Sequence, residues 1–156
     1  QGVPFVGRAG QLLTQILASV RIQRPADIYI ANTVKCRPPD NRVPEPAEIG
    51  SCAPWLSAQL LLVQPKILLL AGSPALRSVL GGHLSEKDTI SKVRGRWFKL
   101  PVPYMDDLLY VMPLFHPSYL LRSPSKEKGS PKWLMWQDMK EVRGALDFIG
   151  KLKVES

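Results

Sequence analysis

A short apolar run in the middle of the chain, followed at once by a helix-start signal, constrains the fold more than any other feature. Residues 66–71 (KILLLA) have the pattern of a fully buried strand, and Gly72-Ser73-Pro74 follows directly. Ser favours the N-cap of a helix and Pro its first turn, so we predict a helix from Ser73 to Gly81-Gly82. A buried strand that leads straight into a helix is typical of βαβ units in a mainly parallel sheet.

Weaker patterns on either side extend this alternation of strands and helices. Strands are predicted at residues 27–31, 97–100 and 108–115, and helices at residues 8–20, from 46 to about 63, and from Ser130-Pro131 to about 152. The predicted fold class is therefore α/β, with a three-layer α/β/α sandwich around a short, mainly parallel four-stranded sheet. At this length, residues 1–156 are predicted to form a single domain.

The charge of the chain favours an anionic partner. The formal net charge of +8 suits nucleic acid first and an anionic membrane second, while a charge that serves only solubility is the alternative. The longest apolar runs fall short of the ~20 residues that a membrane span needs. No signal peptide opens the chain. We therefore expect a cytoplasmic monomer that does not engage membranes.

The chain has two cysteines, Cys36 and Cys52. A structural zinc ion or an iron–sulfur cluster usually takes four protein ligands, so two thiolates do not complete either site. The residues alone leave three alternatives open. These are two ordinary reduced thiols, half of a metal site, or a metal-bridged dimer to which each chain gives both cysteines.

Polar residues follow the predicted strands at the edge where open α/β sheets bind ligands. His116 follows the strand at 108–115 and is flanked by Phe115 and Pro117, so it is the best candidate for chemistry. A hydrogen-bonded structural histidine is the alternative. Asn32 follows the strand at 27–31, where it either ends a turn or hydrogen-bonds the edge of a planar heterocycle.

Aromatic and basic residues supply further candidates. Phe5 either packs in the core or stacks on a base, a role that aromatic rings perform without reading sequence. Residues 92–96 (KVRGR) form a basic turn that is either solvated or in contact with phosphates. Trp133 and Trp136, three residues apart on the last predicted helix, are expected to pack that helix against the sheet.

Four segments, in this order over essentially the whole chain, resemble the family 4 uracil-DNA glycosylases, the thermostable iron–sulfur branch of the uracil-DNA glycosylase superfamily. They are residues 2–13 (GVPFVGRAGQLL), 30–39 (IANTVKCRPP) with Asn41-Arg42, 92–95 (KVRG) and 115–122 (FHPSYLLR). The resemblance implies a DNA-repair hydrolase that cleaves the N-glycosidic bond of uracil in DNA. The nucleotide would first be flipped out of the stack, because the glycosidic carbon is hidden in a duplex.

The resemblance also implies roles for individual residues. Phe5 would stack on the flipped uracil, Asn32 would bond its N3–H and O4, and His116 would donate toward O2 as negative charge grows there. One side chain of residues 119–121 would fill the vacated stack, and Arg122 would contact the backbone. The implied DNA contacts are Lys92, Arg94, Ser118, Tyr119, Leu120, Leu121 and Arg122.

By the same resemblance, Cys36 and Cys52 are the last two of four ligands to a [4Fe–4S] cluster. The family carries a Cys-x-x-Cys pair and a glycine-rich, water-positioning motif upstream of the segment at 2–13, whereas this chain opens with Gln1. We therefore expect an N-terminally truncated domain without the first strand of the sheet, without an assembled cluster and impaired in activity. The rival function is a non-catalytic DNA-binding module of the same fold, indifferent to uracil.

Overall fold

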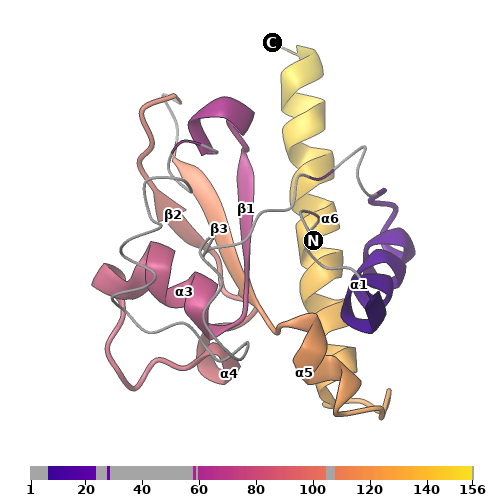
Figure 1. Cartoon of the computed structure of the whole chain (residues 1–156). Helices are drawn as coiled ribbons and strands as arrows, with labels where there is room; N and C mark the ends of the chain where they lie inside the picture. Colours follow the sequence, from indigo (N-terminus) through magenta and orange to yellow (C-terminus); the bar gives the residue numbers. More distant parts are fainter. Residues whose placement is uncertain (1–6, 24–27, 29–57, 59, 105–107, 156) are drawn as a thin grey trace. The chain divides into compact units, whose positions relative to one another are not determined.

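The computed structural model describes residues 7–23, 28, 58, 60–104 and 108–155 (Figure 1). The chain forms two compact units, and each is described by itself. The helical unit comprises Gln1–Tyr29 and Leu114–Ser156, and the sheet unit comprises Ile30–Pro113. The α/β class predicted from the sequence is confirmed, while the prediction of a single domain stays a prediction.

The described sheet has three strands, β1 (Ile67–Ala71), β2 (Phe98–Leu100) and β3 (Leu109–Leu114), in the order β1-β3-β2 (Figure 1). All three lie where the sequence predicts them. The strand expected at 27–31 lies outside the described residues except for Ile28, which is not in a strand. β2 pairs antiparallel with β3, because the short segment between them cannot make the crossover that parallel pairing needs.

The turn from β1 into α3 (Ser73–Leu80) corrects one prediction. Gly72, not Ser73, is the N-cap of this helix, and no side chain makes a capping hydrogen bond. Gly72 has a φ of 90°, a conformation that glycine adopts without the steric penalty of a Cβ. The turn therefore depends on backbone freedom at position 72, and Ser73 and Pro74 become the first two helical residues.

α3 ends at Leu80, as predicted, but not through a left-handed glycine. Gly81 has a φ of −53°, and the chain continues into a single 3₁₀ turn, η2 (Gly81–His83). A short helix, α4 (Ile90–Val93), then precedes β2. Residues 60–63 are helical and match the end of the helix predicted from 46 to about 63, the rest of which lies outside the described residues except for helical Ala58.

One face of the sheet forms the core of the sheet unit. α3 and α4 contribute buried side chains to this core together with strands β1 and β3. Its fully buried members are Leu70, Leu76, Leu80, Val93, Leu109 and Val111. Each such side chain contributes about 1.5–3 kcal/mol by leaving water, so this cluster fixes the positions of the strand ends and of α4.

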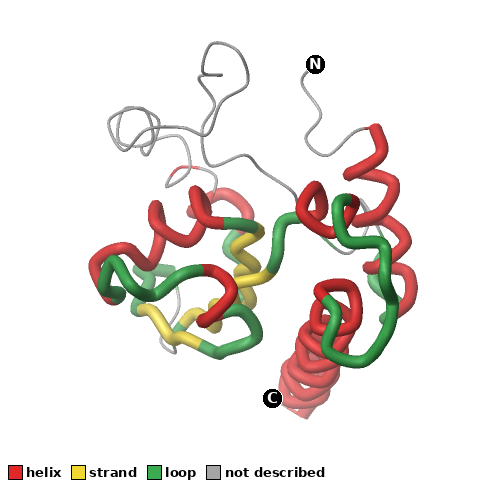
Figure 2. Tube along the Cα trace, turned by 90° about the horizontal axis from the view of Figure 1, so that it is seen from below, coloured by secondary structure: helices red, strands yellow, loops and turns green. Residues whose placement is uncertain are grey.

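The helical unit contains α1 (Gly7–Ser19), α5 (Pro117–Leu121) and α6 (Pro131–Glu155). α1 packs against α5 and α6 (Figure 2). The helices predicted at 8–20 and from Ser130-Pro131 are confirmed, and the Ser130 hydroxyl accepts the Trp133 N–H at 3.3 Å as an N-cap. In the described part of the chain, no helix is long and apolar enough to cross a membrane.

Trp136 is less buried than expected for a residue that packs the last helix against the sheet. Trp136 is 44% exposed, and the Lys140 ammonium lies 3.9 Å from the centroid of its ring. Trp133, in contrast, is half-buried. Positions three apart on a helix differ by about 60° around its axis, so the second ring lies at the edge of the packed face.

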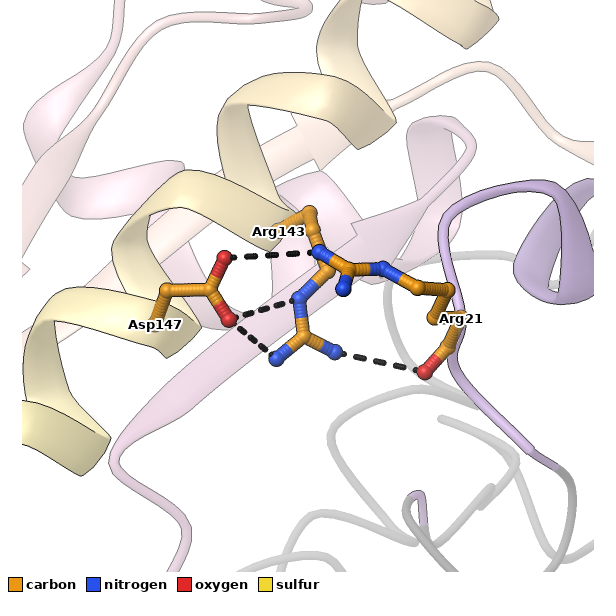
Figure 3. A network of polar contacts seen from close by, with 3 residues as sticks. All are labelled: Arg21, Arg143 and Asp147. Atoms are coloured by element: carbon orange, nitrogen blue, oxygen red, sulfur yellow. Dashed lines mark hydrogen bonds and ion pairs between the residues drawn. The ribbon is translucent and has the colours of Figure 1, made fainter.

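A polar network ties the turn after α1 to α6 (Figure 3). Arg143 donates to the Asp147 carboxylate from Nε at 3.0 Å and also from Nη2, and its Nη1 donates to the Arg21 carbonyl at 3.2 Å. The Arg21 guanidinium lies 3.7 Å from the other Asp147 oxygen. Arg21 has a φ of 61°, which is uncommon outside glycine, so the network holds a strained turn in place.

Candidate active site

His116 lies between the end of β3 and the start of α5, as the sequence predicts for a residue at a strand's carboxyl end. It is the N-cap of α5, with extended backbone angles (φ −72°, ψ 138°), and Pro117 opens the helix. The His116 Nδ1 accepts the Ser118 backbone N–H at 3.1 Å and lies 2.7 Å from the Ser118 hydroxyl. The imidazole is thus held by the first turn of the helix that it caps.

These contacts define the protonation state of His116. A backbone N–H can only donate, so Nδ1 must present its lone pair, and the ring proton is assigned to Nε2. Burial lowers the pKa of His116 from its ordinary value near 6.5, which favours the neutral ring at physiological pH. His116 is therefore a neutral imidazole that carries its proton on Nε2.

The residues that follow His116 form the short helix α5, which periodicity did not predict. Ser118 and Arg122 are exposed, Tyr119 is 39% exposed, and Leu121 is half-buried. Leu120 is fully buried. The Tyr119 ring lies 5.0 Å from the Phe115 ring, centroid to centroid. α5 and its C-cap residue therefore expose a hydroxyl, an aromatic ring and a guanidinium, while the side chain of Leu120 is buried.

The basic turn predicted at 92–96 is half helical. Val93 ends α4 and is fully buried, while Lys92 is exposed and Arg94 is half-buried. Gly95 has a φ of 79°, and its N–H donates to the Pro113 carbonyl at 2.9 Å. This bond fixes the turn to β3 near the carboxyl end of that strand.

Arg77 supports the loop that leads into this turn. Its guanidinium donates to the Ser85 carbonyl at 3.0 Å and to the Asp88 carbonyl at 2.6 Å. The Asp88 carboxylate accepts the Ser85 N–H at 2.9 Å, and this bond lowers the pKa of Asp88. Sequence analysis did not identify Arg77, because its partners are 8 and 11 residues away along the chain.

Four candidates, Phe5, Asn32, Cys36 and Cys52, lie outside the described residues. Phe5 precedes the first residue of α1 by two positions, and α1 packs against α5, the helix that His116 caps. Among the residues that the structure describes, there is no group of three or more His, Cys, Asp or Glu side chains that could hold a metal ion.

Sequence analysis also missed an aromatic and cationic face on the β2–β3 pair. Trp97 and Tyr110 make an edge-to-face contact, and the Lys99 ammonium lies over the Tyr110 ring. The spacing of Trp97 and Lys99, two residues apart in a predicted strand, indicates that these two side chains share a face. The place of Tyr110 on the same face follows only from the pairing of β2 with β3.

Comparisons with known proteins agree with the motifs. The sequence model of the uracil DNA glycosylase superfamily matches residues 1–140. A type-4 uracil-DNA glycosylase of Thermotoga maritima is 45% identical over 126 residues, which cover 81% of this chain and 61% of that protein. One of Sulfurisphaera tokodaii is 34% identical, with coverage of 92% and 62%. A DNA polymerase of Bacillus phage SP01 is 30% identical over 77% of this chain and 12% of its own length. The chain thus spans about three-fifths of the length of these two glycosylases.

Proposed function

The chain belongs to the uracil-DNA glycosylase superfamily, and from this premise we propose that it takes part in DNA repair by hydrolysing the N-glycosidic bond of uracil in DNA. The observation that carries the proposal is the hydrogen bonding of His116. Its Nδ1 accepts from Ser118, so the ring proton is assigned to Nε2.

The chemistry of this bond cleavage explains why such a histidine is useful. As the bond to the sugar breaks, negative charge grows on the uracil ring, and Nε2–H of His116 would donate to O2, where part of that charge collects. A donor aimed at developing charge in a water-excluded site lowers the barrier by about 3–4 kcal/mol. The lowered pKa keeps the ring neutral, so it stabilises the charge without transferring its proton beforehand.

Phe5 and Asn32 are proposed to select the base. The Asn32 amide would accept from uracil N3–H and donate to O4, and cytosine, which presents the opposite pattern, would leave the amide mismatched. Phe5 would stack on the ring. Support for Phe5 comes from α1, which starts two residues later and packs against the helix that follows His116.

Residues of α5 and of the basic turn are proposed to hold the DNA. Lys92, Arg94, Ser118 and Arg122 would contact phosphates, which supply most of the affinity without reading sequence. Leu120 was one of three candidates to fill the space left by the flipped base, but its side chain is fully buried. The exposed Tyr119 is better placed, because a flat ring stacks on the neighbouring bases.

Cys36 and Cys52 are proposed as two ligands of a [4Fe–4S] cluster. Thiolates are the ligands that such clusters take, but these two supply half of the usual four. When bound, the cluster would join the segments that carry residues 36 and 52. The roles proposed for His116, Phe5 and Asn32 do not depend on it.

A comparison of His116→Ala with the unsubstituted protein, each expressed from its complete gene, tests the function. The assay measures release of free uracil from a uracil-containing oligonucleotide, and binding of the same oligonucleotide is measured in parallel. We expect a loss of about 10²–10³ in turnover with binding retained. His83→Ala, at the other histidine, is the matched control and should leave turnover unchanged, because His83 is exposed in η2.

The second candidate is a non-catalytic DNA-binding module, which the match to a phage DNA polymerase favours. This candidate predicts equal, salt-dependent binding of uracil-containing and uracil-free DNA and no release of uracil by the unsubstituted protein. That combination of results would refute the proposed function.

A further inference from the structure

The outer face of the β2–β3 pair carries a compact group of two aromatic rings and a cation, here called the aromatic strand face (Trp97, Lys99 and Tyr110). Trp97 and Tyr110 meet edge to face, with centroids 5.9 Å apart and planes at 79°. The Lys99 ammonium lies 5.4 Å from the Tyr110 centroid, and these two residues are direct cross-strand partners. The face is therefore an ordered arrangement of side chains.

This face is separate from the core of the sheet unit. The neighbours of these residues in the two strands, Phe98, Leu100, Leu109 and Val111, pack into the core. Because successive side chains of a strand point to opposite faces, Lys99 and Tyr110 lie on the other face. Lys99 is exposed, and Tyr110 is 38% exposed. Tyr110 is therefore not part of this core.

The segment that leads into β2 and continues through it carries an excess of positive charge. Residues 89–105 contain four cations, Lys92, Arg94, Arg96 and Lys99, and no Asp or Glu. The first three belong to the basic turn, which runs directly into β2. From Gly95, which is bonded to the Pro113 carbonyl, to Lys99 is four residues, or at most about 13 Å of chain. This length matches roughly four stacked nucleotides at 3.4 Å each.

We propose that the aromatic strand face binds single-stranded DNA that continues past the basic turn. Its rings would stack on bases without reading sequence, and Lys99 would pair with a phosphate, a combination that proteins use to hold single strands. The choice of DNA as the partner rests on the proposed function, but binding here needs neither uracil nor His116. A purely structural role, in which the cross-strand pair only stabilises β2 and β3, is the alternative that the test must separate.

The test uses uracil-free single-stranded oligonucleotides and measures affinity by fluorescence anisotropy at several salt concentrations. Lys99→Gln removes one phosphate contact, so the slope of log affinity against log salt should fall in magnitude by about 0.7. Tyr110→Thr keeps a residue that favours strands and removes the ring, and it should weaken binding by at least about fivefold. Both losses should be smaller for a blunt duplex of the same length.

Lys140→Gln is the matched control. Lys140 also lies over an exposed aromatic ring, that of Trp136, but on α6, where Asp138, Glu141 and Asp147 are close in sequence. Its removal should leave the single-strand affinity and the salt slope closer to those of the unsubstituted protein than Lys99→Gln does. Thermal melting of each variant shows whether it is folded. If Tyr110→Thr does not fold, the conservative Lys99→Gln still tests the proposal.

Three outcomes would overturn the proposal. One is a Lys99→Gln salt slope equal to that of the unsubstituted protein, and another is an equal loss of affinity in Lys140→Gln. The third is a pair of variants that lose thermal stability but keep their affinity, which assigns the face a structural role. Uracil release is measured separately, so failure of the glycosylase function is distinguishable from failure of this proposal.

Discussion

Gly95→Ala tests the turn that joins α4 to β2. Gly95 has a φ of 79°, and a residue with a Cβ pays about 1–2 kcal/mol in this left-handed region. If the backbone of the variant instead relaxes toward negative φ, the N–H leaves the Pro113 carbonyl, which it now reaches at 2.9 Å. Loss of such a hydrogen bond costs about 0.5–1.5 kcal/mol. The first response lowers the free energy of unfolding by about 1–2 kcal/mol. The second lowers it by about 0.5–1.5 kcal/mol.

Urea denaturation followed by tryptophan fluorescence measures this change, with the free energy of unfolding obtained by linear extrapolation to water. Gly144→Ala is the matched control. Gly144 lies within α6, and an added Cβ there would meet nothing within 4 Å. Ala is the better helix former by up to about 1 kcal/mol, so this variant should be more stable than the unsubstituted protein. The same chemical change therefore has opposite signs at two positions of one molecule.

The geometry of the turn also predicts an effect on DNA binding. Lys92 and Arg94 lie within three residues before Gly95, so a shifted turn should weaken the proposed DNA binding. A Gly95→Ala variant that loses less than about 0.5 kcal/mol of stability would refute the reasoning. It would mean that the left-handed conformation at residue 95 and its bond to the end of β3 do not contribute to the free energy of unfolding.

Two further predictions concern ionisable groups. Ser118→Ala removes the hydroxyl 2.7 Å from His116 Nδ1 but keeps the backbone N–H and the burial of the ring. Because burial lowers the pKa of His116, that pKa should stay below its ordinary value in the variant. NMR titration checks this, with His83→Asn to assign the two ring signals, and a return of the pKa to its ordinary value would contradict it. Arg143→Met should lower the melting temperature by roughly 2–4 °C at pH 7. The Arg143 bond lowers the pKa of Asp147, so its stabilisation is present above the ordinary carboxyl pKa and lost as pH falls through the lowered one. The difference in melting temperature should therefore shrink in acid, and a constant difference would count against the network.

The strands and the long helices could be predicted from sequence, and the short helices could not. β1 and α3 follow from an apolar run and a turn signal, and α1 and α6 follow from periodicity and, for α6, a serine N-cap. α4 and α5 have only four and five residues, too few for a helical period to show. The preference of serine for N-caps predicts Ser73 as the cap of α3. The cap is instead Gly72, whose positive φ cannot be inferred from side-chain preferences.

The candidate site divides in the same way. The place of His116 at the end of a strand follows from topology, but its tautomer depends on two atoms of Ser118 that only the folded turn brings to Nδ1. The role of Arg77 depends on a loop folding back on α3. The aromatic strand face depends on register, because a shift of one residue would turn Tyr110 from the outer face to the core.

The packing of α1 on α5 has a consequence for the order in which the molecule folds. α1 ends at Ser19 and α5 begins at Pro117, so a loop of roughly 100 residues must close before the two helices meet. Contacts between distant parts of a sequence slow folding, because the chain loses conformational entropy on closing the loop before the stabilising contact forms. Helical signals should therefore recover early in refolding. The surroundings of His116 should recover only after this loop has closed, so the NMR signals of the His116 ring, rather than helix content, would report the completion of folding.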